Sequence, residues 1–201
     1  MAKKKNSTEK EMPFLDHLEE LRKRIIFSLV SVFAFMGAAF PFSDEMLRLL
    51  TLPNNRLDEP ASLIFLKPTG MLMVRIEISI AAGIIISLPV IFYNIWKFVM
   101  PGLLPREKSY FLPSLFFTTF CFLAGAAFSY FILIPTVLPF LFGLTTNEIN
   151  ATINITEYMS FVLRLIIVAG LIFELPIISF VFSTIGVLTP SFMRTYRRYG
   201  I

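Results

Sequence analysis

Four long apolar runs constrain this chain more than any other feature of its sequence. Each run is about as long as the roughly 20 residues that an α-helix needs to cross the hydrocarbon core of a bilayer. A soluble domain usually carries about a quarter charged residues, whereas this chain has 16% charged and 56% hydrophobic residues. We therefore predict an all-α integral membrane protein with four transmembrane helices, at residues 25–42, 71–96, 110–134 and 158–187.

Two of these runs carry small residues at four-residue spacing. This spacing places each trio on one helix face, where small side chains allow two helices to approach closely. A lipid-facing surface with no contact role is the alternative for either trio. The trios are Ser79, Gly83 and Ser87 in the second run, and Cys121, Gly125 and Ser129 in the third.

The basic residues indicate how the spans are oriented. Most of the 18 lysines and arginines lie before the first run, between the second and third, or after the fourth. Because cytoplasmic loops are enriched in Lys and Arg, we predict that the N-terminus and the C-terminus are both cytoplasmic. The chain is then a single membrane domain, residues 1–201, with a cytoplasmic N-terminal segment (1–24), an outer loop (43–70), a cytoplasmic loop (97–109), an outer cap loop (135–157) and a cytoplasmic end (188–201).

Several classes of function find no support in the sequence. Cys121 and His17 are each alone, so the chain offers no disulfide framework and no cysteine-based metal site. It has no glycine-rich nucleotide loop and no nucleophile triad. We therefore expect no enzyme activity, no catalytic residues, no cofactor and no metal. The net charge of +4 lies mostly beside the apolar runs, where it sets orientation, so we expect no nucleic-acid partner.

Glu174 lies deep in the fourth run, where the free-energy cost of placing a charged side chain in the membrane is highest. An intramembrane carboxylate costs about 2.5–3.5 kcal/mol on insertion scales, so we expect it to face a polar cavity or a partner. The alternative is a protonated glutamate hydrogen-bonded inside the bundle, near a carbonyl freed by Pro176. Arg75, Glu77 and Arg164 lie nearer the outer helix ends, where snorkelling or mutual pairing explains them.

Acidic residues at the predicted cytoplasmic surface are the other candidates. Residues 14–24 repeat apolar side chains at helical spacing, which predicts an amphipathic helix that can lie on the membrane surface. An ordinary lead-in to the first span is the simpler interpretation. Glu107 lies between two bases in a proline-braced loop and could be a solvated turn charge. Together, however, acids at this rim suit a cationic ligand, because arginine–carboxylate pairs are strong and directional.

Four motifs in this order resemble the TatC family, the receptor subunit of the twin-arginine protein translocase. They are Phe-Leu-Asp-His-Leu-Glu-Glu-Leu-Arg (14–22), Ser-Leu-Pro-Val-Ile-Phe-Tyr-Asn-Ile-Trp-Lys-Phe (87–98), Pro-Gly-Leu-Leu-Pro-Arg-Glu-Lys (101–108) and Phe-Glu-Leu-Pro (173–176). The resemblance covers residues 12–199. It implies a multi-pass protein of the bacterial cytoplasmic (inner) membrane that recognises paired-arginine signal peptides. With TatA and TatB type subunits, as a homo-oligomer within a receptor complex, it would take part in export of folded proteins driven by the proton motive force.

The resemblance also implies site residues. Glu20 and Glu107 would be the carboxylates that meet the arginines of the signal peptide. Glu174 matches a buried glutamate that faces a concave cavity in the membrane, and Pro53 matches a functionally important proline of the first outer loop. Further signal-peptide-binding positions are Leu18, Leu21 and Arg22 beside the first carboxylate, and Phe98, Pro101, Arg106 and Lys108 around the second.

The number of spans departs from the family pattern, which has six. We expect this chain to lack the last two helices, as a fragment or as a shortened relative. A proton-coupled small-molecule transporter that uses Glu174 is one alternative function, but it predicts an internal repeat and more mid-membrane polar groups, which the sequence does not contain. A truncated, non-transporting membrane remnant, or a structural anchor, is another.

Overall fold

The computed structural model describes residues 8–57, 60–100, 111–143 and 152–184. Among these, four stretches are long and apolar enough to cross a membrane: Leu15–Asn55, Gly70–Val99, Pro113–Phe142 and Ile155–Ser179. The predicted all-α membrane fold with four spans is confirmed. The elements in chain order are α1 (Thr8–Ala39), the 3₁₀ turn η1 (Phe40–Phe42), α2 (Ser43–Asn55), β1 (Ser62–Ile64), α3 (Gly70–Val99), α4 (Phe111–Phe128), the π turn η4 (Ser129–Leu133), α5 (Ile134–Phe142), β2 (Thr152–Asn154) and α6 (Ile155–Thr184).

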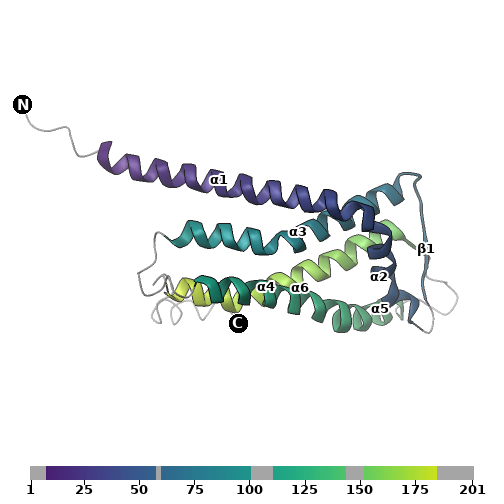
Figure 1. The fold of residues 1–201 in the computed structure, drawn as a ribbon. Coiled ribbons are helices and arrows are strands. Elements are labelled where there is room, and N and C mark those ends of the chain that lie inside the picture. The colour runs from purple at the N-terminus through teal and green to yellow at the C-terminus, as the bar shows by residue number, and fades with distance from the viewer. Residues whose placement is uncertain (1–7, 58–59, 101–110, 144–151, 185–201) are drawn as a thin grey trace, which may run out of the picture.

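Helix α1 joins the predicted amphipathic segment and the first span into one continuous helix of 32 residues. Such a helix is about 48 Å long at 1.5 Å per residue, which exceeds the thickness of a hydrocarbon core. Its N-terminal end extends beyond α3 (Figure 1). The simpler interpretation of residues 14–24, a lead-in continuous with the first span, agrees with this helix, and a separate helix on the membrane surface is not observed. No glycine or proline interrupts residues 14–36, and ion pairs at four-residue spacing favour the helix there.

The long helices pack in pairs, α1 along α3 and α4 along α6, with α3 also against α6 (Figure 1). Glycines mark the closest approaches. A Cβ at Gly83 of α3 would lie 2.8 Å from the backbone nitrogen of Met36 in α1. A Cβ at Gly125 of α4 would lie 2.7 Å from the carbonyl oxygen of Ala169 in α6. Both glycines of the predicted small-residue trios therefore lie at helix contacts rather than toward lipid.

The segments around the predicted outer loop are more regular than expected. Residues 43–55 form helix α2, and strand β1 pairs in parallel with β2, with Leu63 opposite Ile153. Helix α2 and strand β1 lie at the same end of the bundle (Figure 1). The predicted topology likewise places residues 43–70 and 135–157 on one side of the membrane. This strand pair was not predicted. It satisfies backbone groups of two segments that lie far apart in the sequence.

Helix boundaries differ from the predicted ones most in the third span. The predicted span ended at residue 134, and residues 135–157 were expected to form a loop, but α5 carries the helix on to Phe142. Pro135 does not end the helix because it follows directly on the π turn η4, where the regular α-helical hydrogen-bond pattern is already interrupted. Helix α6 begins at Ile155, three residues before the predicted start, after Asn154 Oδ1 accepts a hydrogen bond from the backbone N–H of Thr156.

The core lies toward the end of the bundle that carries α2, where side chains from α2, α3, α5 and α6 meet. Val74, Ile78, Ile134, Met159 and Val162 are almost completely buried there. Large apolar side chains elsewhere are exposed, as expected for helices that face lipid rather than water. Examples are Phe33, Phe116, Phe120 and Phe131.

Candidate functional site

A cleft with a cavity volume of about 640 Å³ opens between α1 and α3, near the N-terminal end of α1. Charged side chains of both signs line it, so its chemistry suits a charged ligand rather than an apolar one. Two aromatic side chains and one amide complete its walls. The lining residues are Asp16, Glu19, Glu20, Lys23, Arg24 and Phe27 from α1, and Tyr93, Asn94 and Lys97 from α3.

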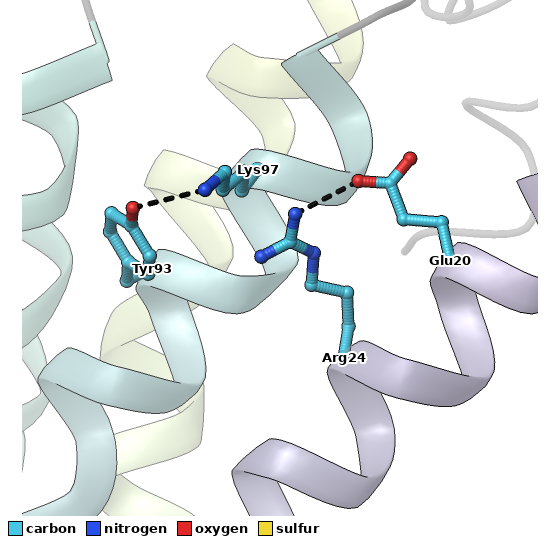
Figure 2. Close-up of polar contacts among 4 residues, drawn as sticks. All are labelled: Glu20, Arg24, Tyr93 and Lys97. Atoms are coloured by element: carbon cyan, nitrogen blue, oxygen red, sulfur yellow. Dashed lines mark hydrogen bonds and ion pairs between the residues drawn. The ribbon is translucent and has the colours of Figure 1, made fainter.

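Glu20, the predicted carboxylate of this region, lies in the cleft. Its Oε1 accepts a hydrogen bond of 2.9 Å from Nη2 of Arg24, one turn further along α1 (Figure 2). The side chain of Arg24 is 22% exposed and that of Glu20 is 34% exposed, so the pair is partly shielded from solvent. The neighbouring pair of Glu19 and Lys23 has the same spacing and the same 2.9 Å length, but its side chains are 60% and 73% exposed.

The opposite wall of the cleft comes from the C-terminal half of α3. Lys97 Nζ donates a hydrogen bond of 3.4 Å to Tyr93 Oη and lies 5.5 Å from the centre of the same ring. Asn94 is buried, and its side-chain Nδ2 donates to the carbonyl oxygen of Val90 within the helix. Figure 2 shows Lys97 and Tyr93 on α3 across from Glu20 and Arg24 on α1.

The structure brings some of the predicted site residues together and leaves others aside. Phe98 stacks on His17 of α1, with ring centroids 4.3 Å apart, and so joins the two helices beside the cleft. Leu18 and Arg22 are exposed and Leu21 is half-buried, and none of the three lines the cleft. The predicted positions Pro101, Arg106, Glu107 and Lys108 lie outside the described residues.

Sequence reasoning missed most of the cleft lining. Arg24 is one of several basic residues before the first span, Tyr93 and Asn94 belong to the 87–98 motif, and Lys97 falls at the start of the predicted cytoplasmic loop, so the pattern gives none of them a binding role. A helical-face analysis could have found them, because Asp16, Glu20 and Arg24 recur every four residues, as do Tyr93 and Lys97. What the pattern could not give is which face of α3 meets α1.

Glu174 is buried in α6, with 1% of its surface exposed. Neither carboxylate oxygen has a hydrogen-bond partner in the described part of the chain. The preceding residue, Phe173, packs on Phe128 of α4, and its side chain would touch a Cβ at Gly125. Glu174 is therefore enclosed within the helix bundle, and the hydrogen-bonded alternative is not observed among the described residues. The expectation that Glu174 faces a cavity stays a prediction.

Pro53 lies inside α2 rather than in a loop, and it is buried. Because proline has no N–H, the carbonyl oxygen of Leu49, four residues earlier, lacks its helical donor. Tyr130 Oη, in the π turn, donates to that oxygen at 2.8 Å. Asn54, the next residue, exchanges two hydrogen bonds with the backbone of Ala61, at 3.1 and 3.2 Å. Pro53 thus exposes a carbonyl that connects α2 to the π turn at this end of the bundle.

The charged residues near the other helix ends pair differently from the expectation. Arg75 forms an ion pair of 2.7 Å with Asp44, at the start of α2, and not with Glu77. Glu77 Oε2 accepts a hydrogen bond of 2.9 Å from Ser160 of α6. Arg164 is exposed. These contacts connect α3 with α2 and α6 and account for the first two residues structurally.

Comparisons with known proteins agree with this architecture. The family described as Sec-independent protein translocase protein (TatC) matches residues 16–201. The chain is 40% identical over 192 residues to a TatC protein of Aquifex aeolicus, covering 94% of this chain and 80% of the relative. It is 34% identical to a TatC protein of Koribacter versatilis, covering 96% of this chain and 72% of the relative.

A solved structure has the same fold. The crystal structure of a twin-arginine translocase receptor, TatC, superposes with a TM-score of 0.83 at 39% sequence identity, covering 91% of this chain and 82% of that one. The fold and the relatives define a multi-pass membrane protein of the protein-translocase class. The chain belongs to the TatC family of Sec-independent protein translocase proteins.

Proposed function

We propose that this chain is the TatC-type component of a twin-arginine translocation system and recognises paired-arginine signal peptides. The observation that carries the proposal is the carboxylate of Glu20 in a cleft between two helices. Two crystal structures similar to this chain are of the twin-arginine translocase receptor TatC, which supports the same ligand class. The cleft face is cytoplasmic in this proposal, as are both chain ends.

The chemistry of the cleft fits a guanidinium ligand. A carboxylate and a guanidinium can form two parallel hydrogen bonds, and such charge-assisted pairs are shorter and stronger than neutral ones. Glu20 is partly shielded from solvent, which strengthens the attraction relative to a fully exposed pair. Phe27 lies at the end of the cleft nearest the membrane span, followed on α1 by the exposed apolar side chains of Val30 and Phe33. The apolar part of a signal peptide would follow this surface between the helices.

A second carboxylate, Glu107, would meet the second arginine. We propose this role together with contributions from Phe98, Pro101, Arg106 and Lys108. Of this group, Phe98 supports the proposal most directly, because its stacking on His17 holds the end of α3 beside the cleft. Leu18, Leu21 and Arg22 would contact the peptide from the exposed flank of α1 rather than from inside the cleft.

The wider setting follows from the family. We propose that the chain lies in the bacterial cytoplasmic membrane, works with TatA and TatB type subunits as a homo-oligomer within a receptor complex, and takes part in export of folded proteins driven by the proton motive force. Glu174 and Pro53 would serve transport rather than signal-peptide binding. The transporter alternative has less support, because it predicts an internal repeat and more mid-membrane polar groups than the sequence contains.

Glu20→Gln tests the proposal with a matched control at the adjacent position. Loss of a charge-assisted pair of about 1.5–3 kcal/mol should weaken binding of a twin-arginine peptide roughly 10- to 100-fold. Glu19→Gln removes the same charge from a pair of the same length that is more exposed, so its effect should stay within about twofold. Binding is measured with a fluorescent peptide on the purified chain in nanodiscs. Equal affinities of wild type and Glu20→Gln would contradict the assignment.

A further inference from the structure

We propose that Arg24 is an internal competitor for the signal-binding carboxylate. In this view it occupies Glu20 while the receptor is empty, and an arginine of the signal peptide displaces it. The inference rests on the proposed function, since it concerns which group pairs with the Glu20 carboxylate before the ligand binds. It assigns Arg24 a role in setting affinity that differs from that of a residue that contacts the ligand.

The first argument is geometric. Arg24 holds Glu20 by one hydrogen bond, from Nη2 to Oε1 at 2.9 Å. An incoming guanidinium that binds in the bidentate manner needs both carboxylate oxygens. Arg24 already occupies one acceptor site on Oε1, and two guanidinium cations at one carboxylate repel each other, so Arg24 competes with the incoming arginine. Figure 2 shows the guanidinium of Arg24 extended from α1 into the space toward α3, where the ligand would enter.

The second argument comes from the charges of the cleft. Its three acids, Asp16, Glu19 and Glu20, are balanced by Lys23, Arg24 and Lys97. Lys23 pairs with Glu19 and Lys97 bonds to Tyr93, so Arg24 is the cation that occupies Glu20 among the residues described at the cleft. Because these charges sum to zero, the cleft has little net electrostatic attraction for a small cation from solution. Glu20 presents an unpaired negative charge to the cleft only when Arg24 moves away from it.

The third argument concerns magnitude. Ion pairs between residues four apart on a helix are weak, and partial burial strengthens them only modestly. Glu20 would therefore be paired with Arg24 for only part of the time in the empty receptor, and a bidentate ligand would displace Arg24 readily. Competition of this size lowers the affinity of every ligand that needs Glu20 by the same factor, about two- to fivefold. It leaves unchanged the ratio between twin-arginine and twin-lysine peptides.

Arg24→Gln removes the competitor and keeps a side chain of similar length. We expect the affinity for a fluorescent twin-arginine peptide to rise about two- to fivefold on the full chain in nanodiscs, with an equal factor for the twin-lysine peptide. Lys23→Gln deletes the same charge one position earlier and reports the general gain from removing a positive charge. When Glu20 is already replaced by Gln, Arg24→Gln should raise the affinity for the peptide no more than Lys23→Gln does. The reason is that no carboxylate remains for the loss of Arg24 to release.

Three results separate the possible outcomes. A fall in affinity with Arg24→Gln would show that Arg24 orients Glu20 or contacts the ligand, and an effect equal to that of Lys23→Gln would show only general electrostatics. Either result overturns the inference while the proposed function stands. If wild type binds both peptides equally and Glu20→Gln changes nothing, the proposed function itself fails. Arg24→Lys, which keeps the charge and the spacing, covers the case in which Arg24→Gln does not fold, and it should raise affinity by less than twofold.

Discussion

Replacing Gly83 with alanine would force α1 and α3 apart at their closest contact. The added Cβ would lie 2.8 Å from the backbone nitrogen of Met36 and 2.9 Å from the carbonyl oxygen of Val32. Both atoms belong to the backbone of α1, so no rotamer change can relieve the overlap. The helices must separate by several tenths of an ångström, which loosens the packing along both faces.

The size of the effect follows from two opposing terms. Inserting a methyl group into a tightly packed contact costs about 1–3 kcal/mol, and a purely backbone overlap belongs at the upper end of that range. Alanine is favoured over glycine in a helix by about 1 kcal/mol, which offsets part of the cost. We expect a net loss of about 1–2 kcal/mol in the free energy of unfolding.

Gly37 in α1 supplies the matched control, because a Cβ added there meets nothing within 4 Å. Gly37→Ala should be neutral or stabilising by up to about 1 kcal/mol. The free energies of both variants can be compared by reversible unfolding of the purified chain in mixed micelles, followed by circular dichroism. If Gly83→Ala is as stable as Gly37→Ala, the close approach of α1 to α3 does not exist in the folded protein.

Two further predictions concern the outer end and the α4–α6 contact. Tyr130→Phe removes the donor to Leu49, whose carbonyl Pro53 leaves without a helical partner, and should cost about 0.5–1.5 kcal/mol. In a Pro53→Ala background the restored N–H should reduce that cost, and additive unfolding free energies in this double-mutant cycle would refute the pairing. Glu174→Leu removes a buried carboxyl without described partners and should stabilise the fold by about 1–3 kcal/mol, while export of a folded reporter falls. A less stable Glu174→Leu variant would show that the carboxyl holds the helices together.

Parts of the candidate site were accessible from sequence because they depend on local patterns. Glu174 stands out as an acid within an apolar run, whereas Glu20 is one of several acids before the first span and was distinguished only as a family position. The glycine contacts followed from the four-residue spacing of small residues. The role of Pro53 was accessible only as a family position, and its physical reason, the free carbonyl of Leu49, required the position of Tyr130, 81 residues away.

The sequence by itself determined that this chain is a membrane protein and that the described residues contain four spans. The bilayer imposes that outcome on any long apolar run, because backbone groups in hydrocarbon must bond within the helix. The tertiary structure alone decided that Arg24 and Lys97 share a cleft with Glu20, and that Glu174 is buried within the helix bundle. These arrangements depend on how each helix is rotated and crossed against its neighbours. Rotation and crossing are set by side-chain packing between distant segments, about which the local hydropathy of a helix carries no information.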